Sequence, residues 1–340
     1  MPEEKMREDK LEIICPAGTP AALRVAVDEG ADAVYLGFRD ETNARNFPGL
    51  NFSRTEFADS LRYAHAQNCK VFVAINTFAE AGRQELWHKA VDDAATLGAD
   101  AIILADIGLL DYAHRTHPDA RLHLSVQASA STPEAIRFYA EQFGVQRVVL
   151  PRVLTLQEIA AINRANLNQN VSVETEIFAF GGMCPMAEGR CSLSSYITGK
   201  SPNRNGVCSP ASHVEYREDA SGLATRLGGF TINRFLPHEN AGYPTLCKGR
   251  FDAEGDISYI FEDPVSLNII EMLPEIITSG VSALKIEGRQ RGKAYVRDVV
   301  RSFRQAVDAF YQGKPLPGLD LLKLSEGQQN TEGAYQRKWR

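Results

Sequence analysis

Residues Lys70-Val71-Phe72-Val73-Ala74-Ile75-Asn76-Thr77 and Ala101-Ile102-Ile103-Leu104-Ala105 are short apolar runs that predict buried β-strands. Near-continuous apolar strands joined by helix-length crossovers are typical of a parallel sheet covered by helices. Eight such runs predict an α/β fold, a (β/α)8 TIM-like barrel, with a doubly wound sheet as the alternative. The other six runs are Leu11 to Cys15, Ala33 to Phe38, Leu122 to Gln127, Arg147 to Leu150, Val173 to Phe180 and Ala283 to Glu287.

The spacing of these runs divides the 340-residue chain into four parts. We expect residues 1–10 to be a disordered charged extension and residues 11–180 to hold the first seven βα units. Residues 181–282, rich in Gly, Pro, Ser and Asn, predict a long insertion between strands seven and eight. Residues 283–340 then supply the last strand, a C-terminal helix and a tail.

Charge and hydropathy limit the classes of partner. With 37 basic and 43 acidic residues the net charge is −6, so no sequence-wide attraction to nucleic acid or to an anionic membrane is expected. No window approaches eighteen consecutive apolar residues, and the charged first ten residues lack the apolar core of a secretory signal. We therefore expect a cytoplasmic protein with no nucleic-acid partner and no membrane insertion.

Four of the six cysteines, Cys184, Cys191, Cys208 and Cys247, fall within the predicted insertion. Each lies beside glycine, proline or small polar residues, in loop contexts where backbone can wrap around a metal centre. Four thiolates suit an iron–sulfur cluster or a zinc ion. Cys15 and Cys69 instead adjoin apolar strands and are typical of small buried side chains.

The spacing of these four cysteines favours an iron–sulfur cluster over a zinc ion. Six, sixteen and thirty-eight residues separate the successive cysteines, whereas structural zinc sites usually pair their ligands with two to four intervening residues. His213 and His238 also lie in the insertion, so a mixed zinc site stays open as the alternative. Structural or redox thiols are the third interpretation.

Polar side chains end several of the predicted strands, where barrel enzymes place their catalytic groups. An Asp or Asn at such a position more often caps the next helix. Taken together, however, these residues predict a polar mouth for an anionic substrate, with the arginines as carboxylate forks. The candidate catalytic residues are Glu176, Glu287 and Gln127, and the candidate substrate-binding residues are Arg45, Asn76, Arg152 and Arg289.

Two segments resemble the signature of the collagenase-like peptidase family of unassigned catalytic type. They are Glu176-Ile177-Phe178-Ala179-Phe180-Gly181-Gly182-Met183-Cys184 and Gly189-Arg190-Cys191-Ser192-Leu193-Ser194. Further matches at residues 43–47, 125–129, 239–250, 285–289 and 333–339 extend the resemblance over nearly everything after the charged extension. The chain is most similar to members that act in oxygen-independent ubiquinone biosynthesis. Gly182 departs from the signature, which usually has Ser or Ala there.

This resemblance implies a [4Fe–4S] cluster held by Cys184, Cys191, Cys208 and Cys247. It also implies hydroxylation of the aromatic ring of ubiquinone precursors without dioxygen, in a heterodimer with a UbiV-like protein and together with a UbiT-like lipid carrier. Prephenate is the expected oxygen donor, by analogy with members that hydroxylate RNA bases. The alternatives are a peptidase, as the family's name suggests, and a scaffold in which the cluster is structural. Against the peptidase, the sequence shows no nucleophile elbow or other activated nucleophile.

Overall fold

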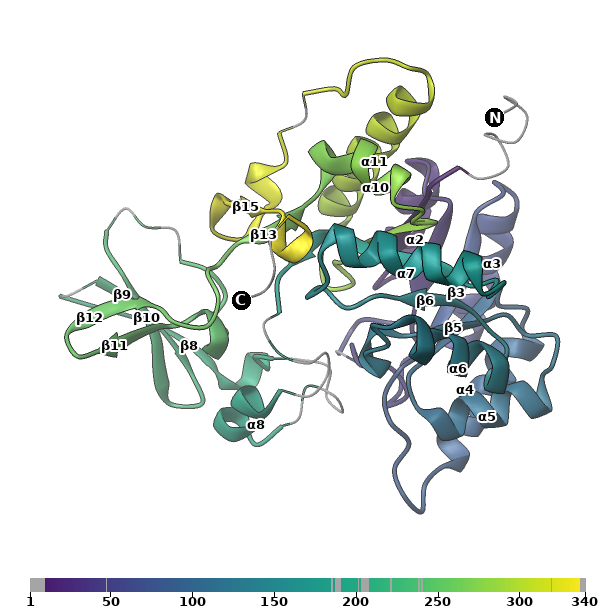
Figure 1. Ribbon diagram of the computed structural model, residues 1–340. Helices are drawn as coiled ribbons and strands as arrows, with labels where there is room; N and C mark the ends of the chain where they lie inside the picture. Colours follow the sequence, from purple (N-terminus) through teal and green to yellow (C-terminus); the bar gives the residue numbers. More distant parts are fainter. Residues whose placement is uncertain are drawn as a thin grey trace.

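The computed structural model describes residues 10–46, 48–184, 186, 191–200, 202, 208–220, 222–237, 239, 241–318 and 320–336 (Figure 1). Eight parallel strands pair in chain order, and β14 pairs with both β1 and β7, which closes the sheet. The predicted (β/α)8 barrel is confirmed, and the doubly wound alternative is excluded because that sheet keeps two open edges. The barrel strands are β1 (Glu12–Pro16), β2 (Ala33–Leu36), β3 (Lys70–Ile75), β4 (Ala101–Leu104), β5 (Leu122–Leu124), β6 (Val145–Val149), β7 (Glu174–Gly182) and β14 (Ala283–Ile286).

Helices surround the barrel and begin at clear sequence signals (Figure 1). Ser53 with Glu56 and Thr155 with Glu158 form capping boxes at the starts of α3 and α7. Asp106 accepts hydrogen bonds from the N–H groups of Gly108 and Leu109 and so caps α5. The barrel helices are α2 (Pro20–Asp28), α3 (Arg54–His65), α4 (Glu85–Thr96), α5 (Ile107–Thr116), α6 (Pro133–Phe143), α7 (Leu156–Asn168), α10 (Leu273–Thr278) and α11 (Lys293–Tyr311).

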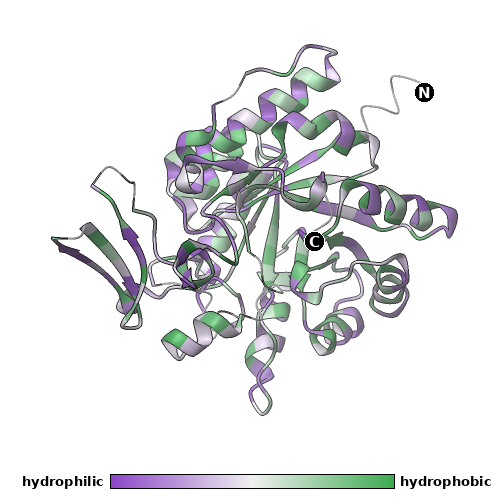
Figure 2. Cartoon of the chain, turned by 60° about the vertical axis from the view of Figure 1, so that its left-hand side comes forward, coloured by the Kyte–Doolittle hydropathy of each residue, from purple (hydrophilic) through white to green (hydrophobic). Residues whose placement is uncertain are grey.

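Apolar side chains form two buried layers. The larger one lies between the strands and the helices, and Figure 2 shows hydrophobic residues concentrated along the central strands. The smaller one fills the inside of the barrel with Ile14, Ala33, Tyr35, Phe72, Ala74, Ala101, Ile103 and Ala283. Many of these inner residues are small, which leaves room inside the barrel for the charged side chains described below.

The segment after β7 leaves the barrel and lies to one side of it (Figure 1). It contains the short helix α8 (Ser192–Thr198), a three-stranded antiparallel sheet and a two-stranded hairpin. The sheet consists of β8 (Val214–Asp219), β9 (Gly222–Leu227) and β10 (Phe230–Phe235), and the hairpin of β11 (Arg250–Ala253) and β12 (Asp256–Tyr259).

The chain rejoins the barrel wall before the predicted end of the insertion. Strand β13 (Ser266–Asn268) pairs antiparallel with the end of β7 and parallel with β15 (Asn330–Thr331). The part that stands apart therefore begins after β7, which ends at Gly182, and ends before β13, whereas residues 181–282 were expected. Of the predicted charged extension, only Lys10 lies within the described residues, and it pairs with Asp308 at 2.5 Å.

None of the helices that the structure describes is long and apolar enough to span a membrane.

Candidate functional site

Glu287 lies at the centre of the polar mouth formed by the C-terminal ends of the strands. Directly after β14, its N–H donates to the Phe180 carbonyl oxygen at 2.8 Å, which ties it to β7. Its carboxylate lies 2.5 Å from Arg152 Nη2 and 3.4 Å from Arg45 Nη2. Burial opposes ionisation, but the two guanidinium groups outweigh it and hold the pKa of Glu287 below its ordinary value. Glu287 is therefore a carboxylate at neutral pH.

Arg152 follows β6 and is held on two sides. Its guanidinium carbon lies 3.4 Å from the centroid of the Phe178 ring, in a cation–π contact, while Nη2 pairs with Glu287. The side chain is only 5% exposed. The structure thus brings together Arg45, Arg152 and Glu287, three residues that the sequence had placed in this mouth.

Arg289 lies two residues after Glu287 and occupies a different part of the mouth. Its Nη1 donates to Asn43 Oδ1 at 3.3 Å, and its guanidinium carbon lies 5.8 Å from the centroid of the Tyr35 ring. Burial lowers the pKa of Arg289 to about 10. Asn43 and Tyr35 were not among the predicted site residues. Asn43 lies in the segment 43–47 that resembles the family, which was its sequence signal, whereas Tyr35 lies in an apolar strand and its position inside the barrel is seen only in the structure.

Glu176 lies inside the barrel, with an exposed fraction of 1%. It accepts a hydrogen bond from Lys285 Nζ at 2.6 Å, and it lies 3.5 Å from Arg147 Nη1. Enclosed between two cations, this carboxylate balances buried charge, and its catalytic role stays a prediction. Sequence reasoning missed Lys285 and Arg147, although each interrupts an apolar strand at a position where a charged side chain is unusual.

Asn76 directly follows β3 and Gln127 lies just after β5, two strands further round the barrel. Asn76 Oδ1 accepts from the Ala44 N–H at 3.0 Å, so it orders the loop that carries Arg45. Gln127 lies in a short 3-10 turn (Val126–Ala128) after β5, and its Oε1 is buried with no hydrogen-bond partner in the described part of the chain. The substrate-binding role of Asn76 and the catalytic role of Gln127 both stay predictions.

The four insertion cysteines gather next to this mouth, and all are free thiols. Burial raises the pKa of the Cys208 thiol to about 11, with Arg45 opposing the rise and Cys184 and Cys191 adding to it. Burial likewise raises the pKa of Cys247 to about 12, and Cys184 adds most among the other thiols. Thiols that influence one another's ionisation in this way lie in one region, although far apart in the sequence.

The sulfur atoms do not form a closed coordination shell. Among the described residues, no three His, Cys, Asp or Glu side chains are arranged as a metal site. Residues 185, 187–190, 201 and 203–207, which lie between the first three cysteines, fall outside the described part, as does His238. Cys191 has a local role as well, since its Sγ accepts from the Ser194 N–H at 3.5 Å and caps α8.

Lys248 joins the cysteine region to the C-terminal segment. It follows Cys247, is 8% exposed and pairs with Glu326. Its ammonium also helps to lower the pKa of Glu287, after the stronger effects of burial, Arg152 and Arg45. The mouth and the cysteines therefore belong to one electrostatic environment.

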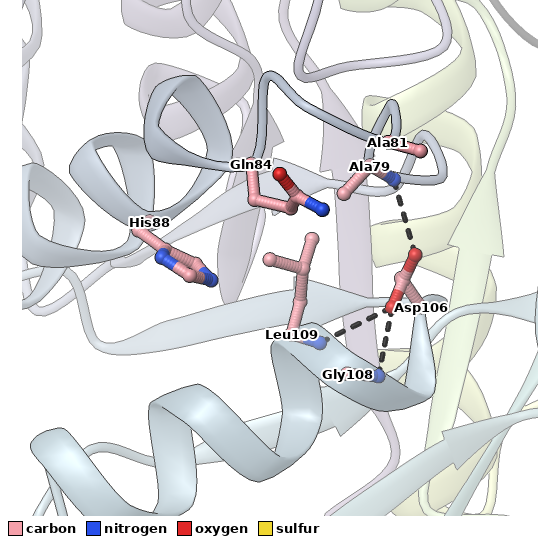
Figure 3. A pocket seen from close by; sticks show the side chains of 7 residues that line it. All are labelled: Ala79, Ala81, Gln84, His88, Asp106, Gly108 and Leu109. Carbon is pink, nitrogen blue, oxygen red and sulfur yellow. Dashed lines mark hydrogen bonds between the residues drawn. The ribbon is translucent and has the colours of Figure 1, made fainter.

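A separate hollow of about 300 Å³ lies between the loop after β3 and the start of α5 (Figure 3). Asp106 lines it, but its carboxylate accepts from the N–H groups of Ala79, Gly108 and Leu109. None of the predicted catalytic, substrate-binding or metal-binding residues lines this hollow. We therefore assign Asp106 to helix capping and place the candidate site at the mouth.

Comparison with known proteins agrees with the resemblance in the signature segments. The tRNA hydroxylation protein P1 of Bacillus subtilis is 31% identical over 88% of this chain and 64% of its own length, and the tRNA hydroxylation protein P of Escherichia coli is 31% identical over 96% and 75%. The 23S rRNA 5-hydroxycytidine C2501 synthase of E. coli is 30% identical over 94% of this chain but 42% of its own length.

This chain thus spans about two thirds or less of two of these relatives. The sequence profile of Peptidase family U32 matches residues 18–339, which includes the whole barrel after β1 and all four insertion cysteines. The chain belongs to Peptidase family U32.

Proposed function

We propose that this chain is the iron–sulfur subunit of a hydroxylase that acts without dioxygen on the aromatic ring of ubiquinone precursors. The observation that carries the proposal is the gathering of Cys184, Cys191, Cys208 and Cys247 beside Arg45 and Glu287. A cluster ligand set and an anion-binding mouth would then share one site. The names of the relatives, which refer to hydroxylation of tRNA and rRNA, support hydroxylation as the class of reaction.

The choice of a ubiquinone precursor over RNA rests on two features of the chain. Its sequence resembles UbiU, of oxygen-independent ubiquinone biosynthesis, and its net charge of −6 does not favour a polyanionic substrate. By the same resemblance we propose a UbiV-like partner in a heterodimer, a UbiT-like lipid carrier, prephenate as oxygen donor and a cytoplasmic location.

The four cysteines fit a [4Fe–4S] cluster in number and chemistry, since all are free and close enough to influence one another. When bound, such a cluster supplies one-electron transfer at a potential set by its surroundings. Burial opposes the charge of Arg45, but Glu287 and then the thiols of Cys208 and Cys184 raise its pKa. Arg45 thus places a positive charge between the cysteines and the mouth, where it would offset thiolate charge.

Glu287 orients the two arginines and, as a carboxylate, accepts hydrogen bonds from the mouth side. The Phe178 ring covers one face of Arg152, which keeps water from that guanidinium and strengthens its pairing with Glu287. These contacts hold the mouth in one arrangement before any ligand arrives.

The peptidase alternative finds little support in the described residues. Burial raises the pKa of Cys69 to about 12 and that of Cys15 well above its usual range, so neither thiol is an activated nucleophile. The other four cysteines would be occupied as metal ligands. Hydrolysis of a labelled gelatin peptide by the cluster-free protein would favour the peptidase.

The test of the proposal is anaerobic purification with iron and sulfide analysis. We expect a brown protein with about four iron and four sulfide per chain, because four thiolates match one cubane. Replacing any one of Cys184, Cys191, Cys208 or Cys247 by Ala removes most of the iron, whereas Cys69→Ala retains it as the matched control. Cells whose only copy carries one of the four replacements lose anaerobic quinone production.

A colourless protein with one zinc, or full iron in any of the four variants, contradicts the cluster assignment. The purified protein could contain full iron while cells that lack it still make normal amounts of quinone anaerobically. That result would mean that the protein holds a cluster but does not act in the proposed pathway. Normal quinone in a variant without iron would favour the scaffold interpretation.

A further inference from the structure

The three arginines of the mouth differ in how their charge is balanced. Arg152 pairs with Glu287 at 2.5 Å. Arg45 also contacts Glu287, at 3.4 Å, and its charge interacts with the thiols of Cys208 and Cys184. Both of these arginines therefore lie against the Glu287 carboxylate, and Arg289 is the third cation of the mouth.

Arg289 has no comparable counter-charge among the residues that the structure describes. Its side chain makes no ion pair there, and its polar contact is the 3.3 Å hydrogen bond from Nη1 to Asn43 Oδ1. That oxygen also accepts from the N–H of Arg45 at 3.0 Å, so a neutral acceptor is shared between two residues. Yet Arg289 is only 7% exposed. A charge this buried is normally paired.

Glu287 is not available to become that partner. Its carboxylate oxygens face Arg152 and Arg45, and its Cβ packs so closely on Gly181 that an added Cβ there would lie 2.7 Å away. Among the described residues, the side-chain hydrogen bond of Arg289 goes to Asn43, and none joins it to a cysteine.

Close packing holds the Arg289 guanidinium where it is. A Cβ added to Gly37 would lie 2.9 Å from Arg289 Nη1 and 2.5 Å from the Asn43 side chain, so this position admits only glycine without rearrangement. On the other side, Tyr35 is fixed by its hydroxyl, which donates to the Ile286 carbonyl oxygen at 3.0 Å. Lys285 Nζ lies 3.9 Å from the centroid of the same ring. The guanidinium is therefore held in position by the fold.

We propose that Arg289, with Asn43 and Tyr35 beside it, is the subsite that receives an anionic group of the ligand, a carboxylate or a phosphate. A planar guanidinium is suited to either group, because its N–H donors match two oxygens at once. The inference rests on the proposed function only in that the mouth is where the ligand binds. It assigns to Arg152 and Arg45 a different task, which is to hold Glu287 and to face the cysteines.

The test is calorimetric titration of the anaerobically purified protein, with its cluster, against sodium malonate, sodium acetate and inorganic phosphate. Malonamide, the neutral diamide of malonate, is the ligand control. We expect at least one anion to bind, and the comparison of malonate with phosphate shows which group the subsite takes. Arg289→Gln weakens that binding at least tenfold. Arg291→Gln, an exposed arginine two residues further on, leaves it unchanged.

Thermal unfolding supplies a second readout that a merely structural role would not produce. Without anion, Arg289→Met has a Tm equal to or above that of the wild type, because an unbalanced buried charge has been removed. The anion raises the Tm of the wild type but not that of the variant. If Arg289→Gln and Arg289→Met fail to fold, the test uses the wild-type titration together with Arg289→Lys. This variant keeps the positive charge but loses the planar pair of N–H donors.

No binding of any of the three anions to the wild type, or equal binding by Arg289→Gln, overturns the inference. A lower Tm of Arg289→Met together with no effect of anions assigns the residue to packing and overturns it as well. Iron content is measured on the same samples. A protein that binds anions but contains no iron contradicts the proposed function and leaves the anion subsite standing.

Discussion

Gly181 and Gly182 are adjacent in β7, but their surroundings differ. Gly181 has a φ of +133°, and a Cβ there would lie 2.7 Å from the Cβ of Glu287. A Cβ on Gly182 would meet nothing closer than Glu326 Oε2, at 3.5 Å. The first glycine is required by backbone geometry and by the approach of the mouth carboxylate, whereas the second position has room for the Ser or Ala that the family signature usually has.

We therefore expect Gly181→Ala to lower the free energy of unfolding by about 2 kcal/mol or more, through strain at positive φ and displacement of Glu287. Gly182→Ala, the matched control, changes it by less than about 0.5 kcal/mol. Urea unfolding of both variants measures the difference. Equal stability of the two would mean that Glu287 does not pack on β7 as described.

Three of the barrel strands, β1, β6 and β7, are joined by charges at the opposite end of the barrel from the mouth. Arg147 of β6 lies 2.5 Å from Glu12 of β1 and 2.5 Å from Glu174 of β7. Glu12 also lies 2.7 Å from Lys70 of β3. Burial opposes ionisation of Glu12, but Arg147 and Lys70 outweigh it and lower its pKa from 4.5.

The lowered pKa of Glu12 determines how the stability of the fold changes with pH. A carboxyl whose pKa is lower in the folded state stabilises the fold fully above its unfolded pKa, here 4.5, and loses that contribution as the pH falls through the folded value. Arg147→Met removes a buried cation that Glu12, Glu174 and Glu176 share, so we expect a loss of about 3 kcal/mol at pH 7. The loss becomes smaller as the pH falls below 4.5, because Glu12 then becomes protonated and no longer needs the Arg147 charge.

Urea unfolding of the wild type and of Arg147→Met at pH 7 and at pH 4 measures this difference. Arg137→Met is the surface control, since Arg137 is 44% exposed and its partner Glu141 lies 4.0 Å away, and we expect a change below about 0.5 kcal/mol. A loss that is equal at both pH values would show that Arg147 contributes by packing and not by charge.

At the scale of the whole molecule, net charge bears on the proposed choice of a ubiquinone precursor over RNA. Nucleic-acid binding derives most of its non-specific affinity from Lys and Arg contacts to phosphates, and this chain has a net charge of −6. We expect no tRNA binding to the purified protein up to about 10 μM at physiological salt. Fluorescence anisotropy with labelled tRNA measures this. Submicromolar binding that weakens steeply with salt would favour an RNA substrate.

Much of the architecture could be predicted from local patterns. Each of the eight apolar runs overlaps a barrel strand, because strands buried on both faces must be almost continuously apolar and only helix-length crossovers can join parallel neighbours. The capping role of Asp106 could also be predicted from neighbouring residues, because a carboxylate directly before a helix can accept hydrogen bonds from N–H groups of the first turn. The end of the insertion was predicted less well, because β13 is held by β7 and β15, both distant in the sequence.

The sequence by itself determined which residues form the barrel, and it marked four cysteines and a set of polar strand ends as candidate site residues. Only the tertiary structure decided how those residues are distributed. Glu176 is enclosed between Lys285 and Arg147, Glu287 pairs with both Arg152 and Arg45, and Arg289 makes no ion pair in the described part of the chain. The physical reason is that strand patterning depends on neighbours along the chain, whereas charge balance depends on distances between side chains that lie more than a hundred residues apart.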